Sequence, residues 1–152
     1  MINAVIDAVK EIAKQEIIPR YLKVQGHYKP DGSICTEADI ATQEALVGKL
    51  QKIYPGKIIS EEMSAAQNND QWNSGDEGLW CIDPIDGTTN FVNGIPYFAV
   101  SVALMNRGRS VLGVVYDPIA DEMFYAEKGK GAFLNNVKLP VKEYTSTTFE
   151  GA

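Results

Sequence analysis

Residues 79–91 read LWCIDPIDGTTNF, and this stretch decides how the rest of the chain is interpreted. An apolar run, typical of a buried strand, stops at Asp83 and then turns through a proline and an Asp-Gly pair. The hydroxyls of Thr88 and Thr89 follow where a helix would begin. The stretch therefore predicts a strand, a tight turn and a helix start, with polar groups gathered at one corner.

The predicted corner has the chemistry of a metal and phosphate site. Asp83 and Asp86 are three residues apart across the turn, with the carbonyl of Ile85 between them. Oxygen ligands without His or Cys favour Mg²⁺ or Ca²⁺ over zinc, and the spacing is not that of an EF-hand. The free amides of a helix start at Gly87 and Thr88 would hold phosphate. The alternative is ordinary turn and capping chemistry, in which both acids are structural.

Composition bounds the class of protein. With 152 residues, 45% of them hydrophobic, the chain is expected to form a single domain over residues 1–152. A net charge of -6 argues against nucleic-acid and anionic-membrane partners. Two cysteines, Cys35 and Cys81, with no signal-like opening predict a cytoplasmic protein without a disulfide framework. No apolar run approaches the length of a membrane span.

The first half of the chain predicts two helices. Apolar residues recur at helical spacing over residues 2–17, and a second apolar stripe covers residues 36–53 behind an N-cap at Thr36. Between them, residues 27–33 contain a Pro-Asp-Gly turn and are expected to form a mobile loop around Lys29.

The segments that flank the central stretch predict a sheet. A short strand is expected at residues 57–60, ending in Glu61 and Glu62. Residues 63–78 are rich in Asn, Asp, Ser and Gly and predict a long exposed loop anchored by Trp72. Downstream, an antiparallel meander is expected at residues 97–105, 111–116 and 122–126, with residues 132–134 after it.

These elements predict an α/β chain of the α+β type, with two helices packed on a mainly antiparallel sheet. Residues 147–152 have strand-like character but no closing turn, so the sequence is expected to be a fragment that stops inside an element. His27 has no cluster of His, Cys or acidic residues around it in sequence, and no catalytic role is assigned to it.

Several motifs in order resemble the inositol monophosphatase family of magnesium-dependent, lithium-sensitive phosphatases. They are the central stretch, the acid pair at residues 61–62, and the segments at residues 29–33 and 36–39. The resemblance spans almost the whole chain, and it implies the N-terminal half of the layered αβαβα sugar-phosphatase fold.

The resemblance also implies a role for each residue of the corner. Glu61, Asp83, the Ile85 carbonyl and Asp86 resemble the metal ligands. Thr88 resembles the hydroxyl that orients the attacking water, and Asp39 resembles its acidic partner.

Further roles follow from the same resemblance. The amides of Gly87, Thr88 and Thr89 would hold phosphate, and Lys29 resembles a loop lysine that closes over the site. Glu62 is expected to be only a neighbour.

The implied reaction is hydrolysis of inositol monophosphate, or a similar polyol phosphate, by water activated on Mg²⁺. The implied assembly is a homodimer of the full-length protein. The family's Trp-Asp motif, which supplies a further aspartate ligand, does not occur in these 152 residues. The chain alone is therefore expected to hold a partial metal site and to have weak or no activity.

Two alternatives remain open. One is a related phosphatase acting on fructose 1,6-bisphosphate, histidinol phosphate or a 3'-phosphonucleotide. The other is a non-catalytic binding or regulatory protein on the same fold.

Overall fold

A computed structural model describes residues 1–29, 32–73 and 78–140. The strand-like residues 147–152 lie outside this range. Within the described chain, no helix is both long and apolar enough to cross a membrane.

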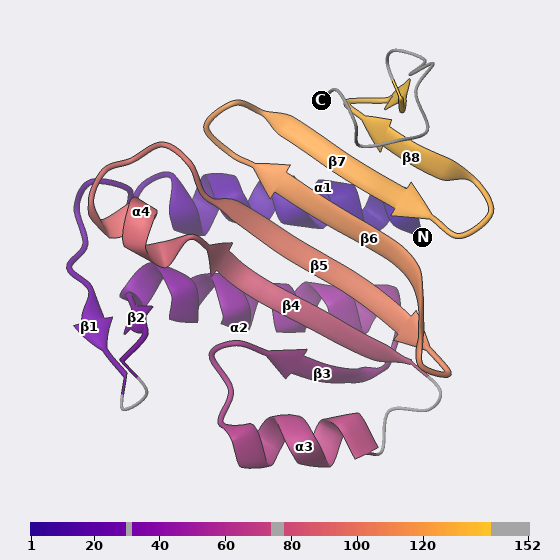
Figure 1. Ribbon diagram of the computed structural model, residues 1–152, viewed down its shortest axis with the longest axis horizontal. Helices are drawn as coiled ribbons and strands as arrows, with labels where there is room; N and C mark the ends of the chain where they lie inside the picture. Colours follow the sequence, from indigo (N-terminus) through magenta and orange to yellow (C-terminus); the bar gives the residue numbers. More distant parts are fainter. Residues whose placement is uncertain (30–31, 74–77, 141–152) are drawn as a thin grey trace, which may run out of the picture.

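The centre of the molecule is a seven-stranded sheet in the order β3-β4-β5-β6-β7-β8-β9 (Figure 1). Only β3 and β4 run parallel, because a helical segment connects them, and every later pair is antiparallel. The predicted meander is therefore confirmed. The strands are β3 (Lys57–Ser60), β4 (Leu79–Asp86), β5 (Ala99–Asn106), β6 (Arg109–Asp117), β7 (Glu122–Glu127), β8 (Gly131–Leu134) and β9 (Val137–Lys138).

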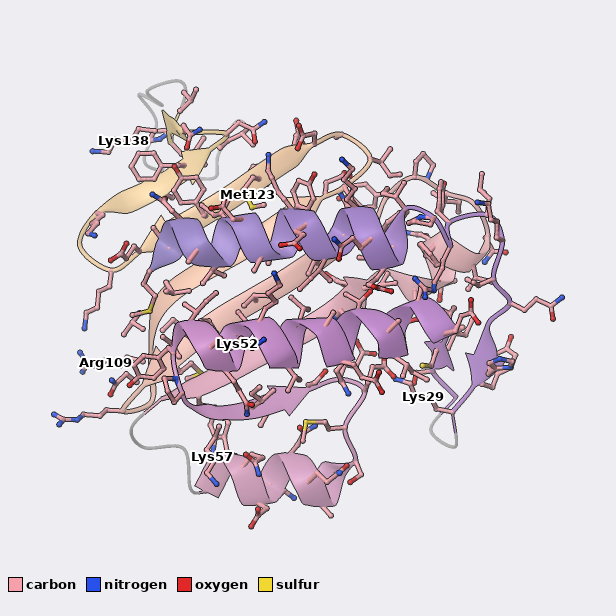
Figure 2. All side chains as sticks on the ribbon, turned by 180° about the vertical axis from the view of Figure 1, so that it is seen from behind. Lys29, Lys52, Lys57, Arg109, Met123 and Lys138 are labelled. Carbon is pink, nitrogen blue, oxygen red and sulfur yellow. The ribbon has the colours of Figure 1, made fainter. Side chains whose placement is uncertain are left out.

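Two long helices cover one face of this sheet, as predicted for the α+β class. They are α1 (Ile2–Ile12), which continues as a π-helical turn (Ala13–Ile17), and α2 (Glu37–Ile53). Figure 2 shows them side by side across the strands. The largest side chains of the resulting core are fully buried and come from both layers: Val9, Ile12, Ile17, Leu46, Leu50, Trp80, Phe91 and Met123.

The opposite face of the sheet carries a row of small side chains. Strand register places Cys81, Ala103, Gly113, Ala126 and Ala132 side by side across five strands. Figure 1 looks onto this face, and the described residues place no helix over its centre. Because these side chains are small, this face of the sheet is hollowed next to the corner at the end of β4.

Two segments that the sequence predicts as loops contain secondary structure. Residues 63–78 were expected to form a loop, but α3 (Ala65–Asn73) occupies much of this segment and lies beside β3 at the edge of the sheet (Figure 1). Its start is explained by Ser64 and Gln67, whose side chains bond reciprocally with each other's backbone and side-chain groups. Trp72, the expected apolar anchor of this segment, is 54% exposed.

The segment before α2 contains short strands that the sequence does not predict. They are β1 (His27–Tyr28) and β2 (Ile34–Cys35), which pair antiparallel on either side of residues 30–31, and Lys29 follows β1 directly. Residues 30 and 31 of the expected loop lie outside the described residues. Both cysteines have free thiols.

Candidate active site

The corner forms where β4 leaves its regular pairing with β5. Asp83 pairs with Ser101 and Asp86 pairs with Ala99, so β4 has one more residue than β5 between these two pairs. This is a β-bulge, and it accommodates Pro84, which has no amide to donate. The bulge turns the end of β4 so that Asp83 is half-buried while Asp86 is exposed.

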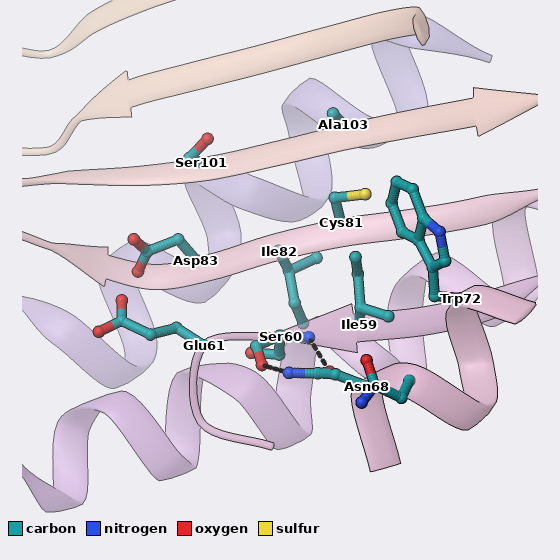
Figure 3. Close-up of a pocket in the computed structure, with 11 residues that line it drawn as sticks. Ile59, Ser60, Glu61, Asn68, Trp72, Cys81, Ile82, Asp83, Ser101 and Ala103 are labelled. Carbon is teal, nitrogen blue, oxygen red and sulfur yellow. Dashed lines mark hydrogen bonds between the residues drawn. The ribbon is translucent and has the colours of Figure 1, made fainter. Parts of the chain in front are cut away.

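Glu61 and Asp83 point toward each other across the ends of the parallel strands β3 and β4 (Figure 3). Both line a hollow of about 440 Å³ on the small-residue face of the sheet. Burial of Asp83, the charge of Glu61 and a hydrogen bond with it raise the pKa of Asp83 to about 7, and the charge of Asp86 acts in the same direction. Two acids held this close repel each other unless a proton or a cation lies between them.

The residues of the corner fit a hard cation. Asp83 Oδ1 is buried and has no hydrogen-bond partner, which is costly for a carboxylate oxygen. A cation at this oxygen would remove the penalty, and the neighbouring donors are oxygens, which Mg²⁺ prefers. The residues that would hold it are Glu61, Asp83 and the carbonyl of Ile85.

Asp86 is placed differently from the other predicted ligands. It lines a second hollow, also of about 440 Å³, together with Asn90, Tyr97 and Glu122. Among residues 1–29, 32–73 and 78–140, no three acid, His or Cys side chains converge as a ready metal site. The structure therefore brings Glu61 and Asp83 together and leaves Asp86 within electrostatic range of Asp83 but facing the neighbouring hollow.

The hydroxyl of Thr88 is held between two oxygens. Thr88 Oγ1 lies 2.9 Å from the Ile85 carbonyl oxygen and 3.1 Å from Asp39 Oδ1, and it can donate its proton to either. The second carboxylate oxygen, Asp39 Oδ2, accepts from the amide of Thr36 at 2.7 Å and from its hydroxyl at 2.5 Å. Thr36 is the N-cap of α2, so helix capping also orients Asp39.

Asp39 is an acid in a low-polarity position. It is buried, and burial raises its pKa above the ordinary value even though the bonds from Thr36 oppose the shift. Thr88 is buried as well, which places this hydrogen-bonded pair under the corner rather than in solvent. The structure therefore joins these two residues, which are 49 positions apart in the sequence.

Gly87 makes the turn into the short helix α4 (Thr88–Val92). Its φ of 94° is unfavourable for residues with a side chain, and a Cβ at this position would lie 3.2 Å from the Tyr97 carbonyl oxygen. The first amides of α4 have no carbonyl partner within the helix, so those of Thr88 and Thr89 are available to an anion.

Lys29 reaches the corner from the position that directly follows β1. Its Nζ lies 2.9 Å from Glu62 Oε2 and 3.9 Å from Glu61 Oε1. Burial alone would lower the pKa of Lys29, but the hydrogen bond and charge of Glu62 outweigh it and raise the pKa. The side chain of Glu62 is only 6% exposed, so this neighbour of Glu61 forms a largely buried ion pair with Lys29.

The two thiols stay protonated at neutral pH. Burial, and then the neighbouring Glu62, raise the pKa of Cys35 to about 12, and burial raises the pKa of Cys81. Neither environment activates a thiolate.

Sequence reasoning missed Asn68 because it fell in the presumed loop. Its side-chain amide bonds to the backbone of Ser60, the residue before Glu61 (Figure 3). The capping pair Ser64 and Gln67 was the available signal for a helix at this place.

Comparisons with known proteins show which family and which structures this chain is similar to. The model of the family described as "Inositol monophosphatase family" matches residues 1–150. The chain is 42% identical over 120 residues to a protein named "Nus factor SuhB" from Pasteurella multocida, covering 78% of this chain and 43% of that protein.

Solved structures give the same result. The chain is similar to the Thermotoga maritima IMPase, with a TM-score of 0.78 and 37% identity over 93% of this chain and 53% of that one. It is also similar to an IMPase/NADP phosphatase complexed with Mg²⁺ and phosphate, with a TM-score of 0.72 and 26% identity over 90% and 50% of the two chains. The chain spans about half the length of the curated relatives it matches.

Proposed function

This chain belongs to the inositol monophosphatase family, and from that premise we propose that it is the N-terminal part of a Mg²⁺-dependent phosphomonoesterase. The single observation that carries the proposal is the buried, unpartnered Oδ1 of Asp83, a residue that lines the same hollow as Glu61. A structural turn would have no reason to keep two repelling acids at a half-buried strand end. The Mg²⁺ and phosphate bound by one similar solved structure support the same assignment.

The proposed chemistry divides between the metal and the protein. Mg²⁺ bound at the corner would lower the pKa of a water molecule and would place positive charge near the leaving oxygen. Thr88 orients the nucleophile: when it donates its proton to Asp39, its oxygen is free to accept a hydrogen bond from the attacking water.

The remaining protein groups hold the substrate and the metal. The amides of Gly87, Thr88 and Thr89 bind the phosphate oxygens. Asp86, which lines the neighbouring hollow within electrostatic range of Asp83, would be a further carboxylate ligand. The half of the relatives that this chain does not match would provide the remaining ligand and most of the substrate pocket, and the full-length protein would be a homodimer.

The proposed substrate is inositol monophosphate or a similar polyol phosphate. The hollow that holds Asp86 also contains Asn90, Glu122 and Asp117, whose side-chain oxygens can accept hydrogen bonds from several hydroxyls. The related substrates fructose 1,6-bisphosphate, histidinol phosphate and a 3'-phosphonucleotide are the competing assignments.

A second candidate function is a non-catalytic binding role. It is favoured by one observation, the name "Nus factor SuhB" of a relative that is 42% identical. The enzyme is favoured by the presence of the complete set of predicted site residues, because a non-catalytic protein has no need of all of them. They are Asp39, Glu61, Asp83, Asp86 and Thr88.

The test is phosphate release by a full-length protein that carries this chain. We expect release from inositol 1-phosphate with Mg²⁺, none in EDTA, and loss of activity in the Asp86→Asn variant. Full activity in EDTA would refute the metal mechanism. Mg²⁺ binding without turnover of inositol 1-phosphate or the three competing substrates would favour the second candidate. The 152-residue chain alone should bind Mg²⁺ weakly and show little or no turnover.

A further inference from the structure

The predicted ligand Glu61 lies in a turn that the sheet supports on one side only. Residues 60–63 form the turn that leads from β3 toward α3, and among the described residues β3 is an edge strand that pairs with β4 alone. An edge strand leaves backbone groups on its outer side that need another partner. At Ser60, which is 3% exposed, water cannot easily supply that partner.

Asn68 of α3 supplies it. Its Oδ1 accepts from the Ser60 amide at 3.1 Å, and its Nδ2 donates to the Ser60 carbonyl oxygen at 2.8 Å. One side chain thus pairs with both backbone groups of one residue, as the backbone of a neighbouring strand would. Figure 3 shows both bonds.

The same side chain also closes the turn. Asn68 Nδ2 lies 3.4 Å from the Met63 carbonyl oxygen, and the Met63 amide donates to the Ser60 carbonyl oxygen at 3.1 Å. The residues on both sides of Glu61 and Glu62 are therefore tied to Asn68. The turn that carries the two acids is anchored to α3 through this one amide.

Anchoring matters here because packing holds the side chain of Glu61 only in part. It is 47% exposed, and it lies opposite the half-buried Asp83 in the same hollow. Its ion pair with Lys29 is long, at 3.9 Å, and Lys29 is engaged mainly by Glu62. The position of a carboxylate that is this exposed depends mainly on the backbone that carries it.

We propose that Asn68 is a positioning residue, which holds the 60–63 turn so that the Glu61 carboxylate stays opposite Asp83. The inference rests on the proposed function, because it assigns the purpose of that position to binding a divalent cation. Residues that orient metal ligands typically change metal affinity when they are removed.

The experiment compares Asn68→Ala with Gln67→Ala in the 152-residue chain. Gln67 is the adjacent amide on the same helix, and it bonds to Ser64 rather than to the turn. Both substitutions introduce the same residue into α3, so an effect of α3 stability alone would appear in both variants.

Two measurements are made. In the metal-free chain, amide hydrogen exchange at Ser60 and Met63 should become about tenfold faster in Asn68→Ala, the effect of losing roughly one hydrogen bond. It should be unchanged in Gln67→Ala. In an NMR titration with Mg²⁺, Asn68→Ala should bind about tenfold more weakly than the parent chain, while Gln67→Ala should match it.

The outcomes separate the two proposals. Unchanged exchange in Asn68→Ala, or equal weakening of Mg²⁺ binding by both variants, would overturn the role of Asn68. If exchange responds as expected but the parent chain binds no Mg²⁺ at any concentration, the proposed metal mechanism fails while the anchoring of the turn by Asn68 stands.

Discussion

Thr88 Oγ1 lies 3.1 Å from Asp39 Oδ1, which joins the turn after β4 to the first turn of α2. The contact depends on Thr36, whose amide and hydroxyl hold the other oxygen of Asp39. A helix cap and a candidate catalytic pair therefore share one carboxylate. Changes to the cap should affect both stability and the corner.

Replacing Thr36 with Val keeps the shape of the side chain and removes its hydroxyl. The hydroxyl oxygen accepts hydrogen bonds from the amides of Ala38 and Asp39. Because Thr36→Val loses these bonds, the free energy of unfolding should fall by about 1 kcal/mol. Urea denaturation of the purified chain would measure the loss. Thr36→Ser retains the hydroxyl and should stay close to the parent chain, so an equal loss in both variants would contradict the capping role.

The pH dependence of stability should reveal Asp83. Its pKa is raised to about 7 in the folded, metal-free chain, whereas the unfolded chain releases this proton near pH 4. Between these values the folded state holds the extra proton, so the contribution of Asp83 to the free energy of unfolding falls as pH rises. The shift for Asp39 has the same sign, because burial raises its pKa too.

The variant Asp83→Asn isolates this contribution. Its stability relative to the parent chain should improve from pH 4 to pH 7 and level off above that, as measured by denaturation at a series of pH values. Saturating Mg²⁺ should stabilise the parent chain more than Asp83→Asn, and should therefore offset the gain of the variant at pH 7. A constant difference across this range would show that Asp83 titrates normally.

Lys29 neutralises a buried carboxylate. In Lys29→Met the side chain of Glu62, 6% exposed, would lose its cation, and the chain should lose about 1–3 kcal/mol of unfolding free energy. The double variant Lys29→Met with Glu62→Gln should recover most of that loss, because no unpaired charge remains. Thermal or urea unfolding of the three proteins checks this, and no recovery in the double variant would argue against charge burial as the cause.

Gly87 should resist substitution. Gly87→Ala forces a side chain into a φ of 94° and toward the Tyr97 carbonyl oxygen, and the expected cost is about 1–3 kcal/mol. Gly113→Ala is a suitable control, because a Cβ there would meet nothing within 4 Å. If the two variants unfold at the same denaturant concentration, the strained turn is not under the constraint described.

Much of the fold could be read from local patterns. The two helices follow from apolar spacing, and the meander follows from alternating strands with short polar connections, since neighbouring strands in sequence usually pair. The segment 63–78 could not be read correctly, because its polar composition is also compatible with a helix that packs at an edge. There, tertiary contact with β3 outweighs weak local preference.

The sequence by itself determined the chemical identity of the corner: two acids, a carbonyl, a glycine turn and two hydroxyls in one short stretch, with the family to which they belong. Only the tertiary structure decided which of these groups meet. Asp39 lies in α2, Glu61 follows β3, and Asn68, which holds Ser60, lies in α3. The approach of Asp39 to Thr88 and of Glu61 to Asp83 therefore depends on how α2, β3 and α3 pack around β4. Burial is likewise a tertiary property, and it sets the raised pKa of Asp83, because a carboxylate loses its hydration only when the surrounding chain is in place.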